Sequence, residues 1–489
     1  MKYILGIDVG TTGTKTVLFR ESGEPLSRAY RAYPLWTERP DECEQDANDL
    51  WRAIVETVRE VTSDREIAEN VIALSISTQG GTLIPVDGRG EPVRRAIVWN
   101  DVRFSKEREA FVSELGSPEK LYRITGWALG KNLPLLAIRY IKDREPWVFE
   151  KTAAFLTVPS FVSLKMTGRA VSDYSNAGID QLFDIRRLEY APELLAFAGV
   201  DKTRLSLVSP SATPVGRLTR TAAEELGLSE SAIFVTGAHD QYAVALGAGK
   251  ITPGSILIGS GTCWVVTAIG DREDFESGFS QSLSAVPGLW GTLRSLSSGG
   301  VCLEWLRNSI ATSGPVMDYK DINQGAASVK AAEDGLFFYP FSGLCDGKNS
   351  FSKGSFVGMD LSHNRFHLAR AIMEGVVFET LWMMEGFKTK PVSECITLAG
   401  GASKSAVWSQ ILADVSGLPI KIPALADLSC VGAAIMAGVG AGLYSSFGEA
   451  YGKFSVGESV ALPDPERTAV YKELFERYKK QAEALGATL

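Results

Sequence analysis

Runs of apolar residues along the chain predict strands and helices in the alternation of an α/β protein. Short apolar runs bounded by Gly, Thr, Ser or Pro predict strands at residues 3–9, 16–19, 71–77, 83–86, 96–99, 233–236, 255–259, 264–268 and 395–399. Apolar residues three or four apart predict a helix over 46–61, and runs of small residues predict helices over 242–249 and 430–443. Residues 404–416 and the charged tail, 464–489, are also expected to be helical.

Two of these strand pairs enclose a short turn built from Gly and Thr or Ser. The first turn spans residues 10–14 and the second spans residues 259–262, and each predicts a β-hairpin. Each half of the chain therefore opens with the same strand–turn–strand unit. The pattern predicts two α/β domains, residues 1–247 and 248–489, which meet near the Gly-, Ala- and Pro-containing segment 247–253.

Composition narrows the possible classes of protein. Lys and Arg number 50 against 58 Asp and Glu, a net charge of -8 without basic runs, which argues against nucleic acid as a partner. The six cysteines contain no C-x-x-C, and no signal peptide or membrane span is predicted, so we expect a cytoplasmic protein. His363 and His367 have no acidic third ligand in a recognisable motif, and we expect surface or capping residues rather than zinc ligands.

The two Gly/Thr turns are the strongest candidates for chemistry. A turn without Cβ atoms lets backbone N–H groups approach an anion closely, and two such turns across a cleft could hold a polyphosphate. Taken singly, each could be an ordinary hairpin turn. Asp8 ends the first apolar strand, where a carboxylate is costly unless it is solvated or faces a cation. Beside phosphates it could hold Mg²⁺; otherwise it would cap the turn.

Two further segments have both a functional and a structural interpretation. Asp240 stands between a predicted strand and a predicted helix, where it could be a general base for a substrate hydroxyl or only a helix N-cap. Gly400 and Gly401 follow a strand and could let adenine or ribose pack on bare backbone, or they could form a plain turn. The chain has neither a P-loop nor a Rossmann dinucleotide motif.

Together these motifs resemble the FGGY family of carbohydrate kinases, within the actin/hexokinase-like superfamily, along essentially the whole chain. Residues 6–15 resemble the first phosphate motif, 258–262 the second, and 399–403 the adenosine motif. Residues 354–359 and 367–374 match the family's C-terminal signature, and segments 99–101 and 166–168 look like xylulokinase-type members.

The resemblance implies two actin-like (ribonuclease H-like) domains with a catalytic cleft between them, and transfer of phosphate from ATP to a sugar or polyol. Asp240 matches the catalytic base and Asp8 the carboxylate associated with Mg²⁺. The positions that match nucleotide contacts are Thr11, Thr12, Gly13, Lys15, Gly261, Thr262, Gly300, Gly400, Gly401 and Ser405. The positions around the sugar are Gln79, Gly80, Gly81, Asp101, Asp240 and Gln241. A homodimer is expected from the family.

Two departures from the family pattern concern the substrate. Xylulokinases similar to this chain carry Met-His where Gly80 and Gly81 stand here, so two side chains are missing from the expected sugar pocket. The N-terminal signature also has Ala137 where Lys is usual and Tyr140 where Trp is usual. A ketopentose such as xylulose or ribulose is the first expectation, and a polyol such as erythritol or a larger ketose is the alternative.

Two alternative functions from other classes of protein stay open. A sugar-responsive regulator without catalysis would need a DNA-binding module, and no helix-turn-helix pattern precedes residue 3. A nucleotide switch like actin or a chaperone would not predict the C-terminal signature or the pair Asp240 and Gln241. Both predict that no sugar stimulates ADP release.

Overall fold

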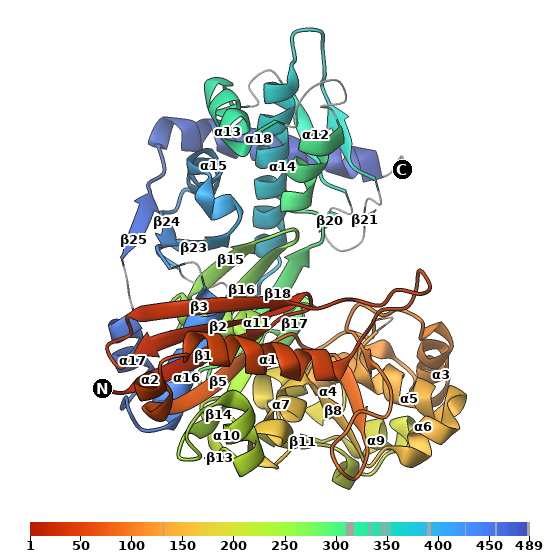
Figure 1. Cartoon of the computed structure of the whole chain (residues 1–489). Helices are drawn as coiled ribbons and strands as arrows, with labels where there is room; N and C mark the ends of the chain where they lie inside the picture. The colour runs from red at the N-terminus through yellow and green to blue at the C-terminus, as the bar shows by residue number, and fades with distance from the viewer. Residues whose placement is uncertain are drawn as a thin grey trace.

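The structure is a computed structural model that describes residues 1–489 except 131, 310–316, 332–334, 342–343, 346–348, 351–352, 389–392, 426, 455–456 and 487–489. Two large sheets, one of six strands and one of seven, form the cores of the two halves of the chain. In Figure 1 the half that contains the N-terminus lies below and most of the second half lies above it.

The first sheet joins an antiparallel meander to two parallel strands. Its order is β13-β14-β5-β1-β2-β3, in which β1, β2 and β3 are antiparallel while β5 and β14 run parallel to β1. The strands are β1 (Tyr3–Val9), β2 (Gly13–Arg20), β3 (Pro25–Ala32), β5 (Val71–Thr78), β13 (Pro214–Arg217) and β14 (Ile233–His239).

The second sheet repeats this arrangement. Its order is β17-β18-β16-β15-β23-β24-β25, in which β15, β16 and β18 form the meander and β23 and β24 run parallel to β15. The strands are β15 (Ile256–Ser260), β16 (Trp264–Gly270), β17 (Ser280–Leu283), β18 (Trp290–Leu296), β23 (Ile396–Gly400), β24 (Ile420–Pro423) and β25 (Glu458–Ala461). The expected strand–turn–strand unit therefore opens both sheets.

Alternation along β1 assigns its side chains to two layers. Leu5, Ile7 and Val9 point into one core, where α1 (Ala47–Val61) packs with Asp46 as its N-cap. Ile4 points to the opposite face, into a second core with α11 (Asp240–Gly247) and α16 (Leu428–Gly440). Gly6 and Asp8 share that face by the same alternation. The same core includes Leu257 of β15 and Ala399 of β23, so α11 and α16 contact both sheets.

The helices α11 and α16 cross at glycines that no larger residue could replace without movement. A Cβ on Gly432 would lie 2.0 Å from the carbonyl oxygen of Ala243, and one on Gly247 would lie 2.0 Å from that of Leu428. On the sheet side, a Cβ on Gly6 would lie 1.9 Å from the carbonyl oxygen of Cys430. The small-residue run around α16 thus lets this helix of the second half pack directly on the first sheet.

The outer face of the second sheet carries the helices of the upper domain. Its core combines residues of β15, β16 and β23 with residues of α12 (Gly300–Ser309), α14 (Arg365–Glu385) and α15 (Ala406–Ser416). At the start of α14, His367 and the N-cap residue Asn364 form a capping box, which confirms a capping role for this histidine. The helix α18 (Pro465–Gly486) confirms the helical tail, whose last three positions lie outside the described residues.

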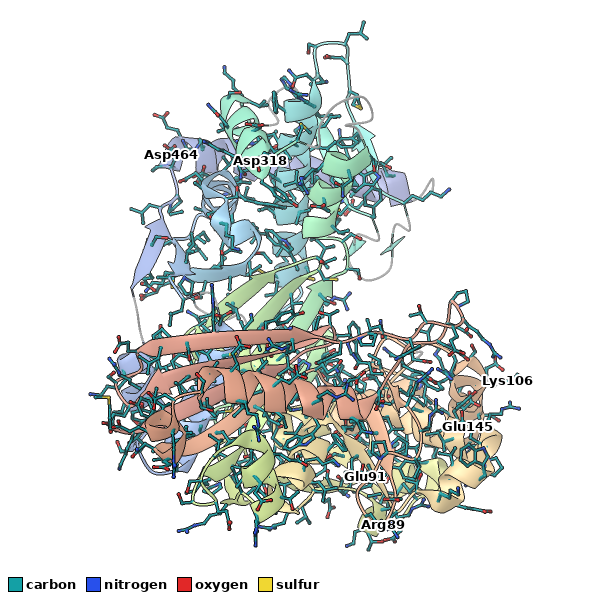
Figure 2. The ribbon with its side chains drawn as sticks, in the orientation of Figure 1. Arg89, Glu91, Lys106, Glu145, Asp318 and Asp464 are labelled. Carbon is teal, nitrogen blue, oxygen red and sulfur yellow. The ribbon has the colours of Figure 1, made fainter. Side chains whose placement is uncertain are left out.

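The sequence did not predict a lobe inserted in the first half. It is built on the sheet β4-β7-β6-β8, and Arg94 and Arg103 both pair with Glu44 on β4. Figure 2 shows Arg89, Glu91, Lys106 and Glu145 in the lower half and Asp318 and Asp464 in the upper one. The strands are β4 (Glu44–Gln45), β6 (Leu83–Val86), β7 (Ala96–Ile97) and β8 (Ala154–Thr157); the helices are α3 (Ser105–Leu115), α4 (Pro118–Thr125), α5 (Pro134–Arg144), α6 (Pro146–Lys151) and α9 (Pro192–Ala198).

The other elements complete the two halves. The helices are α2 (Arg65–Glu69), α7 (Val158–Thr167), α8 (Tyr174–Ala177), α10 (Arg220–Leu226), α13 (Tyr319–Ser328) and α17 (Phe447–Phe454). The strands are β9 (Val171–Asp173), β10 (Phe183–Asp184), β11 (Glu189–Tyr190), β12 (Leu207–Ser209), β19 (Phe337–Tyr339), β20 (Leu344–Cys345), β21 (Asn349–Ser350) and β22 (Ser355–Val357). Within the described ranges, no helix combines the length and the apolar character needed to cross a membrane.

Candidate active site

The first Gly/Thr turn joins β1 to β2 and leaves backbone donors unused. The N–H of Gly10 donates to the carbonyl oxygen of Gly13 at 3.1 Å and closes the turn. In the part of the chain that the structure describes, the N–H groups of Thr11 and Thr12 have no hydrogen-bond partner. The indole N–H of Trp99 donates to Oγ1 of Thr11 at 2.9 Å and orients that hydroxyl. The turn therefore offers donors to an anion, as its sequence predicts.

The second turn joins β15 to β16 and gathers the other glycines of the predicted nucleotide site. A Cβ on Gly300 would lie 2.5 Å from the carbonyl oxygen of Gly261. The N–H of Gly401 donates to the carbonyl oxygen of Ser260 at 2.7 Å, and Gly400 has a φ of +96°. Three segments far apart in sequence thus meet at this turn. Among the described residues, the N–H of Thr262 has no partner, whereas the N–H of Gly261 is used inside the turn.

Ser405 lies at the start of α15 with its hydroxyl already engaged. It is the N-cap of the helix, where Oγ accepts a hydrogen bond from the N–H of Trp408 at 3.1 Å. The same Oγ donates to Oδ1 of Asn323 at 2.6 Å. These bonds give Ser405 a structural task, and its contact with nucleotide stays a prediction.

Asp8 lies on the α16 face of the first sheet, beside a second carboxylate. Its Oδ1 accepts a hydrogen bond from the Ser77 hydroxyl at 2.8 Å. Burial raises the pKa of the Asp8 carboxyl above its ordinary value, and the nearby charge of Asp240 raises it further. Hydrogen bonds from Ser77 and Ser429 and the charge of Lys15 act in the opposite direction. The two carboxylates therefore lie close enough to repel each other, and a bound cation would relieve that repulsion.

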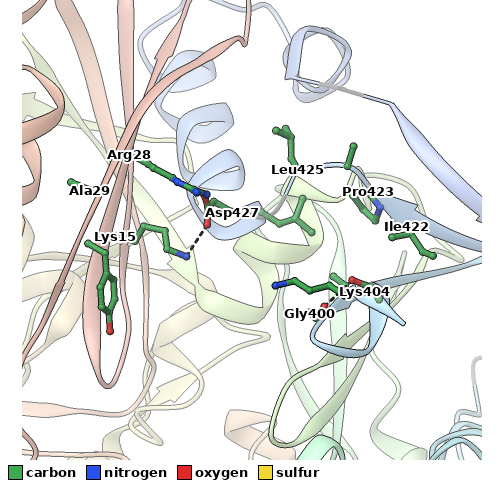
Figure 3. A pocket seen from close by; sticks show the side chains of 14 residues that line it. Lys15, Arg28, Ala29, Gly400, Lys404, Ile422, Pro423, Leu425 and Asp427 are labelled. Carbon is green, nitrogen blue, oxygen red and sulfur yellow. Dashed lines mark hydrogen bonds and ion pairs between the residues drawn. The ribbon is translucent and has the colours of Figure 1, made fainter. Parts of the chain in front are cut away.

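Lys15 points from β2 into a cleft between the two halves of the molecule. Its Nζ lies 2.8 Å from Oδ1 of Asp427, which is the N-cap residue of α16. Burial alone would lower the pKa of Lys15, but the hydrogen bond to Asp427 raises it above its ordinary value. The cleft has a volume of about 650 Å³ and is lined by Lys15, Arg28, Gly400 and Lys404. Figure 3 shows this lining, with Lys15 and Arg28 on one wall and Gly400 and Lys404 on the other.

Asp240 is the first residue of α11, immediately after the end of β14. Its side chain keeps 36% of its surface exposed, so one edge of the carboxylate faces open space. The Nε2 of His239 lies 3.3 Å from Oδ1 of Asp240. The next side chain, Gln241, reaches toward the second turn, because its Oε1 lies 3.9 Å from the position of a Cβ on Gly259. The pair Asp240 and Gln241 thus stands between the first sheet and the second hairpin.

Gln79 follows β5 and is connected to the first turn through another glutamine. Its Nε2 donates to Oε1 of Gln45 at 3.0 Å, and Nε2 of Gln45 donates to the carbonyl oxygen of Thr11. Since Gln79 is only 2% exposed, this chain of amides is fixed in place. The predicted sugar side of the site is therefore joined to the predicted phosphate side.

The two glycines after Gln79 leave less space than their missing side chains suggest. A Cβ on Gly80 would lie 2.6 Å from Cδ2 of His239, and one on Gly81 would lie 2.8 Å from Cδ2 of Leu133. Gly81 also has a φ of +73°, a conformation that favours glycine. Neighbouring side chains therefore occupy much of the room that we expected to find vacant, and an imidazole enters it from position 239.

Asp101 is fully buried and its carboxylate is saturated by the protein. Its oxygens accept hydrogen bonds from the backbone N–H groups of Cys43 and Arg103 and from the Arg103 guanidinium, with distances of 2.6 to 3.2 Å. The Arg103 guanidinium is itself only 7% exposed. In this conformation Asp101 binds Cys43 and Arg103, and its contact with substrate stays a prediction.

Four side chains around the site were not among the sequence candidates. Gln45, Trp99, Trp127 and His239 belong to the site by contact: the first two bind Thr11, and the ring centroids of the last two lie 6.3 Å apart. The sequence pointed only to the neighbourhood of Trp99 and His239: Trp99 lies in the segment 99–101, and His239 directly precedes Asp240. Gln45 and Trp127 had none, because only folding brings them to the site.

The carboxylate oxygens of the site could hold a cation only together with the oxygens of a bound phosphate. Within the described ranges, no cluster of three or more His, Cys, Asp or Glu side chains could hold a metal ion alone. Asp8 and Asp240 supply carboxylate oxygens, and the oxygens of a bound phosphate would have to complete the shell of a hard cation such as Mg²⁺. The arrangement offers unused backbone N–H groups at two turns and a partly exposed carboxylate at Asp240.

Comparison with known proteins gives consistent matches over both halves. The model of the FGGY family of carbohydrate kinases, N-terminal domain, matches residues 3–247, and that of the C-terminal domain matches residues 254–441. A xylulose kinase of Bacillus subtilis (strain 168) is 28% identical over 486 residues, 98% of this chain and 96% of that protein. A gluconokinase of the same strain is 27% identical over 464 residues, 91% of this chain and 89% of that protein.

A solved structure supports the same fold. The ligand-bound xylulose kinase from Lactobacillus acidophilus superposes with a TM-score of 0.90 and 24% sequence identity, over 100% of this chain and 99% of that one. At this identity the similarity concerns the fold. It confirms the expectation of two actin-like α/β domains.

Proposed function

Since this chain belongs to the FGGY family of carbohydrate kinases and is an ATP-dependent sugar kinase, we propose that it phosphorylates a ketopentose such as xylulose or ribulose, with Asp240 as general base. The finer parts of this statement, the sugar and the residue roles, are our proposal. So are the division into domains at residues 247 and 248, a homodimer and a cytoplasmic location.

One observation carries the assignment of roles. Asp8 lies on strand β1 and Asp240 begins helix α11, yet the charge of Asp240 raises the pKa of Asp8, so the two carboxylates are neighbours in the folded chain. A carboxylate that is partly exposed beside two anion-binding turns suits a base that faces a substrate hydroxyl. A carboxylate that is buried on the strand before the first turn suits the cation side of the same site.

The proposed reaction depends on positioning and charge more than on covalent chemistry. The free N–H groups of Thr11, Thr12 and Thr262 would hold phosphate oxygens from both sides of the cleft. Lys15 and Lys404 supply positive charge to the cleft walls. Asp240 would orient the attacking hydroxyl and take its proton. Asp8 would hold Mg²⁺ directly or through water, and the bound ion neutralises phosphate charge.

The polar atoms around His239 favour a neutral polyhydroxyl substrate. Gln79, Asn176 and Gln181 each have a buried amide oxygen that lacks a hydrogen-bond partner among the described residues. Their orientation is fixed, because each NH₂ group donates to an acceptor: Gln45 Oε1 at 3.0 Å, Asp173 Oδ2 at 2.7 Å and Ala128 O at 2.9 Å. If substrate binding uncovers these oxygens, sugar hydroxyls would supply the donors that they lack, whereas a carboxylate would not.

This argument also ranks the alternatives. A polyol such as erythritol is the second candidate, because its hydroxyls donate in the same way. A larger ketose has less support, because His239 and Leu133 fill the space beside Gly80 and Gly81. A sugar acid, considered because of the gluconokinase relative, also has donor hydroxyls, but its carboxylate would add only acceptors to a site that already has unpartnered acceptor oxygens.

A substrate panel tests the choice of sugar. The assay is ADP release from Mg-ATP with xylulose and ribulose of both configurations, erythritol, glycerol and gluconate, compared by kcat/KM. We expect a ketopentose to give the highest value and gluconate to be at least about tenfold lower, since each unpaired buried group costs about 1–3 kcal/mol. Preference for gluconate would refute the proposed substrate class, and a flat panel with nucleotide bound would favour a sensor without catalysis.

A matched pair of Asp→Asn variants tests the base. Asp240→Asn should lower kcat by roughly 10²–10⁴-fold and leave nucleotide affinity nearly unchanged. Asp64→Asn is the control, because Asp64 is an exposed N-cap of α2 and Asn caps a helix equally well. Turnover retained by Asp240→Asn would remove Asp240 from the role of base.

A further inference from the structure

His239 is held rigidly although its imidazole makes no hydrogen bond of its own. The side chain is 9% exposed, and its ring packs near the rings of Trp127 and Tyr242, with centroid distances of 6.3 and 5.8 Å. The backbone N–H of His239 donates to the Ser175 hydroxyl at 2.8 Å. Among the described residues, Nδ1 is buried without a hydrogen-bond partner. A rigid, buried polar ring that lacks partners is costly unless it serves a second group.

The group that faces this ring is the Asp240 carboxylate. Nε2 of His239 lies 3.3 Å from Oδ1 of Asp240, while that oxygen accepts no hydrogen bond within the described part of the chain. The two atoms are close enough for a hydrogen bond, but the ring N–H is not aligned with the oxygen, as is common at catalytic groups before substrate binds. The other carboxylate oxygen is left for the exposed side of the residue.

The backbone at Gly80 is what makes room for the imidazole. A Cβ at this position would lie 2.6 Å from Cδ2 and 3.0 Å from Nε2 of His239, and 2.9 Å from Cδ1 of Ile179. Real Cβ atoms do not approach other atoms so closely. A side chain at position 80 would therefore press on the ring of His239 and on the Cδ1 end of Ile179.

We propose that His239 is a positioning residue for Asp240: its Nε2–H binds Oδ1 and so directs the other oxygen toward the substrate hydroxyl. Gly80 belongs to the same device, since it provides the space that the ring needs. This inference rests on the proposed role of Asp240 as base. It adds to that role a fixed orientation of the carboxylate and explains why the two glycines do not simply enlarge the sugar pocket.

Two substitutions of His239 separate the hydrogen bond from the volume of the ring. His239→Gln keeps an N–H at about the reach of Nε2, whereas His239→Met fills similar volume without a donor. We expect His239→Met to lower kcat by about 10–100-fold with KM values for sugar and ATP within about threefold, and His239→Gln to recover most of kcat. His367→Gln is the matched control, because Gln at this capping-box position preserves the start of α14 and lies outside the site.

The outcomes distinguish this inference from its premise. Full kcat in His239→Met, or equal losses in the Met and Gln variants, would overturn the positioning role while Asp240→Asn still tests the base. If Asp240→Asn keeps turnover, the premise itself fails. Thermal unfolding shows whether each variant is still folded. A folded His239→Met protein with low kcat would support the positioning role.

A double-mutant cycle tests the part played by Gly80. Gly80→Ala alone should lower kcat about as much as His239→Ala, because the added methyl group pushes the ring away from Asp240. In the His239→Ala background the same change should cause little further loss, so the two effects should not add. Independent, additive losses would refute the coupling between Gly80 and His239.

Discussion

The crossing of α11 and α16 at Gly432 provides a sharp test of the packing. In Gly432→Ala the new Cβ would lie 2.0 Å from the carbonyl oxygen of Ala243, about 1.4 Å short of the 3.4 Å at which ordinary contact begins. Both groups belong to helix backbones, so no side chain can rotate aside and the helices must separate. Overpacking of this kind costs about 1–3 kcal/mol and occasionally more, and we expect the upper end of that range, about 3 kcal/mol.

Thermal unfolding followed by circular dichroism measures this effect. At about 2–4 °C per kcal/mol for a large domain, the midpoint of Gly432→Ala should fall by roughly 6–12 °C. Gly452→Ala in α17 is the control, because a Cβ there meets no atom within 4 Å and Ala is the better helix former. A midpoint of Gly432→Ala within about 1 °C of the wild type would refute the close approach of the two helices.

Three further substitutions test contacts around the site. Asp427→Asn should lower the free energy of unfolding in urea by about 1–2 kcal/mol, because it weakens the 2.8 Å pairing with Lys15; an unchanged midpoint would contradict this. Trp99→Phe should raise the KM for ATP roughly 3–10-fold with a smaller change in kcat, since Thr11 loses the indole N–H that orients it. Glu44→Gln should destabilise the protein by about 1–2 kcal/mol in calorimetry, because Arg94 and Arg103 lose a shared carboxylate while keeping Glu145 and Asp101; an unchanged stability would contradict it.

Local pattern predicted the elements that carry the site more closely than the elements around it. The strand at 3–9 has the expected bounds, and α1 begins at Ala47, one residue after the expected start of the helix at 46. The strand at 96–99 ends two residues early, at Ile97, where the chain turns toward Trp99. The lobe of α3 to α6 was not predicted, because its helices are short and depend on tertiary packing rather than on strong periodicity.

The placement of α16 shows why sequence order alone is insufficient. The small residues from 430 onward predicted a helix, but residue numbers assigned it to the second half of the chain. In the structure it packs on β1 through Gly6, which becomes visible only when backbone distances are known. The same limit applies to His239, since the sequence shows that Gly80 lacks a side chain but not which neighbour enters the space.

The helices α11 and α16 contribute both to the proposed catalytic site and to the contact between the two halves of the chain. Asp240 is the first residue of α11, and Ser429, in the first turn of α16, lowers the pKa of the Asp8 carboxyl. Because glycine contacts lock α11 against α16, the two carboxylates are held as one unit on the first sheet. The second hairpin belongs to the other sheet, and Gln241 reaches toward it. A change in the angle between the domains would therefore alter the distance from both carboxylates to the second phosphate turn together, which suits a kinase that must assemble its site around two substrates.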